Sequence, residues 1–210
     1  MNEFQSWHAD TLGAKVVDAL TKNNFTASYV KNREEAVKLL LALIPSDAAV
    51  GIGGSWSITV DLNMGEVLEK RGNTVYNHNK PGITPQQAAD FRQKQLTADV
   101  FLSGTNALTL DGKLVNTDGA GNRVAAMIYG PKQVIVVAGV NKIVRDIAEA
   151  EHRIEMYAAP INNKRIGRAN PCTQTGVCMD CQGPTRICNV TTIIRKRPSL
   201  TDFHVIVVGE

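Results

Sequence analysis

The sequence predicts an α/β fold in which helices cover a mostly parallel sheet. Short strand-like runs alternate along the chain with segments whose apolar residues recur at helical spacing. Several runs, such as residues 133–138, are continuously apolar, which is typical of strands covered by helices on both faces. The 210 residues are 43% hydrophobic and 20% charged, which excludes a disordered, collagen-like or coiled-coil protein and favours one domain over residues 1–210.

The individual elements follow from periodicity and from their start and stop signals. Asn32 can cap a helix that Pro45 ends, and Thr84 with Pro85 opens another helix. Asp111 and Gly112 form a hairpin turn signal. Helices are predicted over residues 3–22, 33–43, 57–71, 84–96 and 146–157, and strands over residues 25–30, 48–52, 74–76, 99–103, 133–138 and 204–208.

The segment over residues 160–198 differs from the rest of the chain. It is rich in Asn, Arg, Thr, Gly and Cys and lacks apolar periodicity. We therefore expect an irregular excursion from the domain that needs a covalent or metal crosslink to hold it.

A glycine-rich loop follows the predicted strand over residues 48–52 and leads into a helix. Glycines allow close approach of a ligand to the backbone, and a helix N-terminus offers free N–H groups to an anion. The candidate ligand-binding residues of this loop are Gly53, Gly54, Ser55 and Thr59. The alternative is a tight turn capped by serine. The spacing matches neither the dinucleotide fingerprint nor the P-loop, so no nucleotide motif is present.

Two further polar loops follow apolar runs. Asn106, Asn116, Asp118, Asn122 and Arg123 form a dense polar set that leads into a helix. Asp118 can act as a general base or bind hydroxyls, with Asn116 beside it, and Arg123 can clamp a carboxylate or phosphate. The alternative is that Asn and Asp form turns and cap the helix while Arg123 is solvated.

Asn141 and Lys142 follow the predicted strand over residues 133–138. Lys142 can neutralise an anionic substrate, although a single lysine at such a position is also typical of a solvated surface. Because open parallel sheets bind ligands at the carboxyl ends of their strands, we expect the three polar loops to share one anion site.

Four cysteines lie within 17 residues, at Cys172, Cys178, Cys181 and Cys188. The pair Cys178 and Cys181 has the C-x2-C spacing in which two thiolates can face one metal. An iron–sulfur cluster, which we slightly favour, and a tetrahedral zinc ion both suit four thiolates. Buried free thiols and a redox disulfide are the alternatives.

Charge and apolar patterning exclude several other partners. The net charge is only +3 and aromatic residues make up 5%, so neither a nucleic-acid footprint nor a base-stacking platform is indicated. No signal-peptide pattern or membrane-length apolar run is present, and the cysteines are clustered as in a reducing compartment. We therefore expect a cytoplasmic protein that binds neither nucleic acid nor membrane.

Four blocks of sequence resemble the lactate-utilisation (LUD) domain family, in its stand-alone, YkgG-like form. The blocks are GIGGSWSIT at 51–59, SGTNALTLDGKLVNTDGAGNRVAAMIYGPKQVIVVAGVNKIV at 103–144, RIEMYAAPINNKR at 153–165 and PCTQTGVCMDCQGPTRIC at 171–188. The resemblance implies the fold shared by ribose-5-phosphate isomerase, glucosamine-6-phosphate deaminase and coenzyme A transferases. It also implies a part in oxidation of L-lactate to pyruvate beside iron–sulfur partner proteins.

The leading hypothesis is a subunit of an oxidoreductase system for L-lactate that binds a small carboxylate or phosphate in its polar loops. A second hypothesis is a free-standing sugar-phosphate isomerase or an acyl or coenzyme A transferase, with Asp118 as base. A third is a regulatory or scaffold domain whose cysteine site is structural. A homo-oligomer is compatible with all three.

Overall fold

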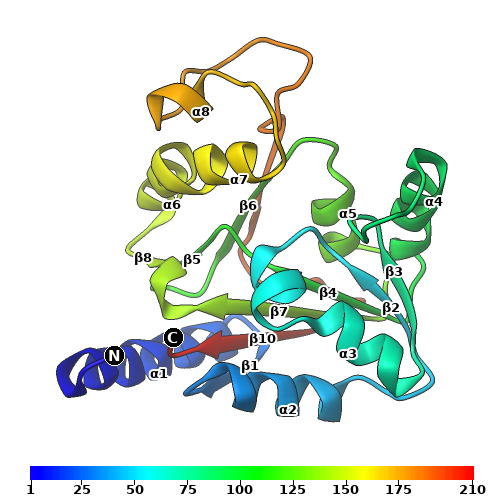
Figure 1. The fold of residues 1–210 in the computed structure, drawn as a ribbon. Helices are drawn as coiled ribbons and strands as arrows, with labels where there is room; N and C mark the ends of the chain where they lie inside the picture. The colour runs from blue at the N-terminus through cyan, green and yellow to red at the C-terminus, as the bar shows by residue number, and fades with distance from the viewer.

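Two sheets organise the protein, for which a computed structural model describes residues 1–210. The main sheet is parallel throughout and has the order β1-β10-β7-β4-β2-β3. The bounds of its strands are β1 Thr26–Val30, β2 Ala49–Ile52, β3 Thr74–Asn77, β4 Val100–Gly104, β7 Gln133–Gly139 and β10 Asp202–Val208. The predicted α/β class is confirmed (Figure 1).

Helices cover both faces of the main sheet. One face carries α2 (Arg33–Leu43), the single π-helical turn η1 (Ser57–Asp61) and α3 (Met64–Arg71), which pack Leu40, Ile58 and Leu68 against the strands. The opposite face carries α1 (Glu3–Lys22) and α5 (Asn122–Ile128). Strands that are apolar on both faces are therefore buried between two layers, as their sequences predict.

Side-chain caps start the helices at the predicted positions. The Asn32 side chain accepts a hydrogen bond from the Glu35 N–H at 2.9 Å, so α2 begins at Arg33. Thr84 and Gln87 form a reciprocal capping box before α4 (Pro85–Gln95). Such caps satisfy N–H groups that have no partner inside the helix.

A second, smaller sheet lies beside the main one, with the order β8-β5-β6-β9. Its strands are β5 Ala107–Thr109, β6 Leu114–Asp118, β8 Ile143–Val144 and β9 Val190–Ile194. The predicted hairpin turn joins β5 to β6, and Gly112 adopts the positive φ of 79° that favours glycine there. The prediction that Asn116 and Asp118 lie in a loop is wrong, because both belong to β6.

Two predicted helices have different boundaries. Residues 57–71 do not form one helix, because Asn63 adopts a left-handed conformation, with φ of 46°, between η1 and α3. The helix predicted over residues 146–157 continues to Arg165, as α6 (Ile147–Arg153), η3 (Ile154–Ala158) and α7 (Ala159–Arg165). The wide π turn η3 accommodates Pro160, whose ring would strike a carbonyl in a regular helix.

The segment over residues 160–198 is only partly irregular. It includes most of α7, the short helix α8 (Cys172–Thr175) and strand β9, while residues 176–189 form bends, a turn and irregular backbone. Figure 1 shows α6, α7, α8 and this loop stacked at one end of the molecule. None of the helices combines the length and the apolar character that spanning a bilayer requires.

Candidate functional site

The carboxyl ends of β2, β4 and β7 meet beneath α6 and α7. Arg153 of α6 donates to the Asn106 carbonyl at 2.6 Å and to the Asn141 carbonyl at 3.3 Å. Arg165 of α7 donates to the Gly54 carbonyl at 3.1 Å and lies over the ring of Trp56. The three polar loops predicted to share a site are therefore linked at one edge of the sheet, where α/β proteins place their ligands.

The glycine loop leaves the hydroxyls of Ser55 and Ser57 free. The Gly53 N–H donates to the Leu102 carbonyl at 2.9 Å, and a Cβ at Gly53 would lie 2.8 Å from Ser103 Oγ. The Thr59 hydroxyl is used, because it donates to the Ser55 carbonyl at 2.9 Å. The hydroxyls of Ser55 and Ser57 make no hydrogen bond within the protein, and Ser55 is the one that lies against Gly104.

Arg123 is engaged entirely by the protein. Its Nε donates to Asp118 Oδ1 at 2.8 Å, and its two terminal nitrogens donate to the Oδ1 atoms of Asn116 and Asn106 at 2.7 and 2.8 Å. The same nitrogens also reach the carbonyls of Gly104 and Thr117. Because a guanidinium has five N–H donors, Arg123 has none left with which to clamp a carboxylate.

Asp118 is likewise held by internal contacts. Its Oδ1 is paired with Arg123, and its Oδ2 accepts the Val124 N–H of α5 at 3.1 Å. The side chain is 9% exposed. To act as a base, Asp118 would have to break this ion pair, so its geometry favours a structural role at the start of α5, whereas the alternative of a solvated Arg123 is wrong because that side chain is only 13% exposed.

The other residues of this polar set contribute less. Asn116 is fully buried and its Nδ2 has no hydrogen-bond partner. Asn106 uses its Oδ1 for the Thr117 N–H as well as for Arg123. Asn122 is half-buried at the start of α5, and Asn141 is exposed in the 3-10 turn η2 (Val140–Lys142).

At this edge of the sheet, Lys142 is a positively charged side chain without a partner in the protein. Its Nζ makes neither a hydrogen bond nor an ion pair, and it lies beside Gly104, 3.5 Å from where a Cβ would be. Burial, together with the charges of Arg153 and Arg123, lowers the pKa of Lys142 to about 8, although the nearby carboxylate of Asp61 acts in the opposite direction. The partly buried amine therefore lies in a positive environment that an anion would neutralise.

His78 belongs to the same edge and was not predicted. It follows β3, and its Nδ1 lies 2.8 Å from Gln95 Nε2, which also contacts the carbonyls of Ile52 and Tyr76. His78 Nε2 lies 3.8 Å from the position of a Cβ on Gly54. Burial, together with the charge of Arg92, lowers the pKa of His78 to about 4, so the imidazole is neutral at pH 7.

The four cysteines are free thiols in the segment above this edge. Cys172 is buried at the start of α8, and its Sγ accepts from Asn163 Nδ2 at 3.3 Å. Burial raises the pKa of the Cys188 thiol to about 11, and the neighbouring Cys178, Cys172 and Cys181 also raise it. All four thiols are thus close enough to influence one another electrostatically.

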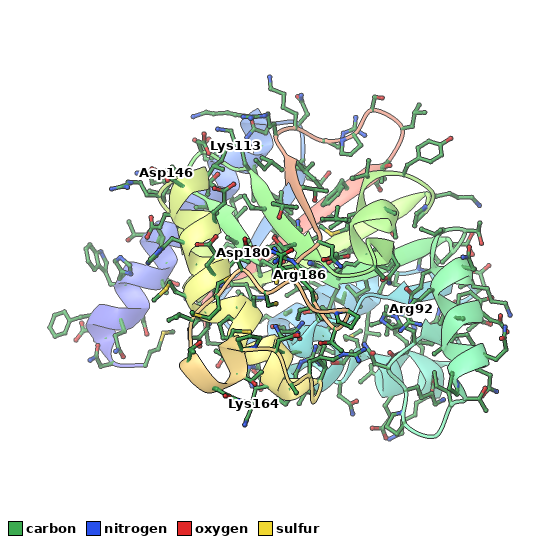
Figure 2. The ribbon with its side chains drawn as sticks, turned by 90° about the horizontal axis from the view of Figure 1, so that it is seen from above. Arg92, Lys113, Asp146, Lys164, Asp180 and Arg186 are labelled. Atoms are coloured by element: carbon green, nitrogen blue, oxygen red, sulfur yellow. The ribbon has the colours of Figure 1, made fainter.

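Arg186 ties the cysteine segment together. It donates to Asp180 Oδ1 at 2.7 Å, and Figure 2 labels these two neighbouring side chains. It also donates to the carbonyls of Cys181 and Cys188 at 2.6 and 3.0 Å. No three His, Cys, Asp or Glu side chains converge as they would around a metal ion. The donor set suits a thiolate-bound group, but the sulfur atoms would have to move together to hold a single ion.

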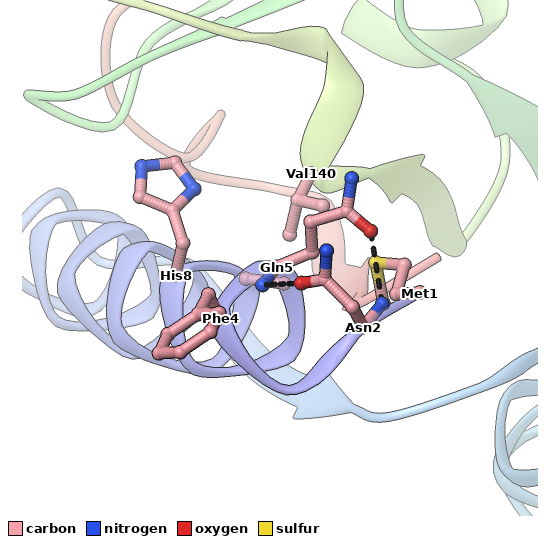
Figure 3. A pocket seen from close by; sticks show the side chains of 7 residues that line it. Met1, Asn2, Phe4, Gln5, His8 and Val140 are labelled. Carbon is pink, nitrogen blue, oxygen red and sulfur yellow. Dashed lines mark hydrogen bonds between the residues drawn. The ribbon is translucent and has the colours of Figure 1, made fainter.

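A hollow of about 420 Å³ lies on the other side of η2. Met1, Asn2, Phe4, Gln5, His8 and Ala9 of the amino-terminal region line it, with Val140 opposite (Figure 3). The lining lacks the lysine and arginine side chains of the sheet edge. The polar edge around Lys142, rather than this hollow, therefore carries the chemistry suited to an anion.

Comparisons with known proteins agree with this architecture. The profile of the LUD domain family matches residues 13–208. The crystal structure of a DUF162 family protein from Deinococcus radiodurans is similar over 95% of this chain and 98% of that chain, with a TM-score of 0.52 and 14% identity. At that identity the likeness shows a shared fold. No curated protein matches the sequence.

Proposed function

Because the chain belongs to the LUD domain family, we propose that it binds a small carboxylate or phosphate at the carboxyl edge of its main sheet. The observation that carries this proposal is the unpaired amine of Lys142. A partly buried cation without a counter-ion is unfavourable, and a bound anion would supply the missing charge.

The surrounding charges favour an anion over a cation or a neutral ligand. Arg153 and Arg165 donate only to backbone carbonyls or to an asparagine, so their positive charges are not neutralised by a carboxylate. Asp61 is the carboxylate whose charge reaches Lys142, but it forms no ion pair with the amine, and Asp118 is already neutralised by Arg123. The unpaired Ser55 hydroxyl and the neutral His78 provide hydrogen-bonding groups beside these charges.

Within this class we propose a 2-hydroxy or 2-oxo acid, as in the oxidation of L-lactate to pyruvate beside iron–sulfur proteins. The family membership supports this choice, and the mixture of cations and a free hydroxyl suits a carboxylate next to an oxygen. The alternative isomerase or transferase with Asp118 as base is less well supported, because both oxygens of Asp118 are occupied.

We also propose that Cys172, Cys178, Cys181 and Cys188 hold a thiolate-bound metal centre, an iron–sulfur cluster in preference to zinc. Their mutual electrostatic influence and the backbone contacts of Arg186 support a single site. A bound cluster would supply one-electron transfer, whereas zinc would serve as a structural crosslink. By holding such a group, the four cysteines would order residues 176–189 above the anion site.

Ligand binding tests the proposed function directly. Calorimetric titration with L-lactate, pyruvate and inorganic phosphate should show binding of at least one anion by the wild-type protein. Lys142→Met should weaken it by roughly 10- to 100-fold, the equivalent of one charge-assisted hydrogen bond. The matched control is Lys132→Met, whose side chain is 85% exposed and distant from the edge. Equal affinity in Lys142→Met and Lys132→Met would contradict the proposal.

A further inference from the structure

Two unpaired polar groups share the space beside Gly104. A Cβ on that glycine would lie 3.5 Å from Lys142 Nζ and would collide with Ser55 Oγ. Neither the amine nor the hydroxyl has a hydrogen-bond partner in the protein. Because Gly104 has no side chain, Ser55 Oγ and Lys142 Nζ both lie against its Cα, and both remain free to contact a ligand.

We propose that Lys142 forms a covalent imine with a 2-oxo acid bound in this space. The inference rests on the proposed function, because it takes the anion site as the place where the acid binds. It goes further by assigning Lys142 as a nucleophile and by restricting the covalent ligand to acids that carry a carbonyl next to the carboxylate.

A fraction of the amine is in the state that this reaction needs. An amine attacks a carbonyl through its lone pair, so it must be unprotonated. With the pKa of Lys142 lowered to about 8, roughly one amine in ten is neutral at pH 7. Since no carboxylate pairs with Nζ, no ion pair has to be broken before the proton leaves.

Arg153 is placed to hold the carboxylate of the same ligand. It lies close enough to Lys142 to lower the pKa of the amine, and its Nε makes no hydrogen bond. Its guanidinium stacks over the Tyr157 ring and is fixed by the carbonyls of Asn106 and Asn141. If Arg153 holds the carboxylate of the 2-oxo acid, the carbonyl carbon next to that carboxylate is placed beside the Lys142 amine.

The reaction balances without an oxidant or a reductant. The Lys142 lone pair attacks the carbonyl carbon to form a carbinolamine, whose oxygen takes up a proton. That oxygen leaves as water while the nitrogen loses its remaining proton, which gives the imine. The unpaired Ser55 hydroxyl lies on the side of Gly104 where it can donate a hydrogen bond to the departing oxygen.

Only the oxidised form of the substrate can form the covalent imine. A 2-hydroxy acid has no carbonyl and can bind only through its charge and hydroxyl. A 2-oxo acid, the product when a 2-hydroxy acid is oxidised, would be retained covalently. Lys142 thereby distinguishes product from substrate in the proposed reaction.

Reductive trapping tests the imine separately from binding. The full chain is incubated at pH 7 with pyruvate and cyanoborohydride, and intact mass and peptide mapping follow the labelling. We expect one 1-carboxyethyl group on Lys142, formed at least about tenfold faster than on any other lysine, with a rate that rises as pH approaches 8. L-lactate should give no label, and Lys132→Arg should be labelled like the wild type.

The outcomes separate the two proposals. Calorimetric binding of pyruvate without a label on Lys142 would overturn the imine and leave the anion site standing. Labelling of Lys142 at the rate of exposed lysines would also overturn it. Absence of both label and binding would contradict the anion site itself. Lys142→Arg, checked by circular dichroism for folding, should lose the label.

Discussion

Replacing Arg123 with leucine tests whether this residue is structural. The side chain is 13% exposed, and its loss would leave the carboxylate of Asp118, which is 9% exposed, without a counter-ion. Breaking a buried ion pair by removing one partner costs about 3–5 kcal/mol. The Oδ1 of Asn116 would lose a donor as well, which adds a further cost of about 1–3 kcal/mol if water does not replace it.

We therefore expect Arg123→Leu to lower the free energy of unfolding by at least about 4 kcal/mol, the sum of the lower ends of these two costs. Urea unfolding followed by circular dichroism measures this directly, and thermal unfolding should show a Tm lower by at least about 8 °C. Arg145→Leu is the matched control. It breaks an ion pair with Asp146 that is 76% and 49% exposed, so it should cost less than about 1 kcal/mol.

A double variant adds a sharper criterion. Asp118→Asn removes the charge that Arg123→Leu would strand, so combining them should recover about 1–3 kcal/mol relative to additivity. A loss in Arg123→Leu as small as that of the exposed control would refute the reasoning. Unchanged stability together with weaker binding of L-lactate would also refute it, because that result would mean that Arg123 binds the ligand.

Three further predictions concern the anion edge and the cysteines. Binding of L-lactate should be strongest below pH 7 and weaken as pH rises through about 8, where Lys142 loses its proton. Lys142→Arg should flatten the pH profile measured by calorimetry. A flat profile for the wild-type protein would contradict this prediction. Gly54→Ala places a Cβ 2.9 Å from the exposed Asn79 side chain, which can move, so stability should change by less than about 1 kcal/mol. The same variant should weaken ligand binding at least about fivefold, whereas the control Gly65→Ala should leave ligand binding unchanged. Cys178→Ser should lower the iron or zinc content after anaerobic purification and make residues 176–189 more sensitive to protease, whereas the neighbouring exposed Met179→Ser should do neither.

Local signals predicted most of the main sheet and its helices. The Asn32 cap fixed the start of α2, and the apolar runs located β4 and β7 within one residue or so. These features depend on residues close together in the chain, where periodicity and capping act. The break at Asn63 was missed because its left-handed conformation depends on how η1 and α3 pack against the sheet.

The site was harder to predict because its properties arise between distant segments. Lys142 and Ser55 were both candidates, but that neither has a partner follows only from the folded arrangement. Arg123 was a natural carboxylate clamp in sequence, and contacts with Asn106 and Gly104 from another strand end use up its donors. His78 had no local signal, since the contact that orients it comes from Gln95 on the following helix.

The position of β10 constrains the order in which the protein can be assembled. Strand β10 lies between β1 and β7, so Thr26 pairs with His204, far away in the sequence. Until the ribosome has made residue 208, β1 has no neighbour in the sheet and the apolar face of α1 can pack only on an incomplete core. Between the synthesis of β7 and that of β10, a nascent chain would therefore expose an unpaired edge of β7, and an unpaired strand edge favours pairing with other chains.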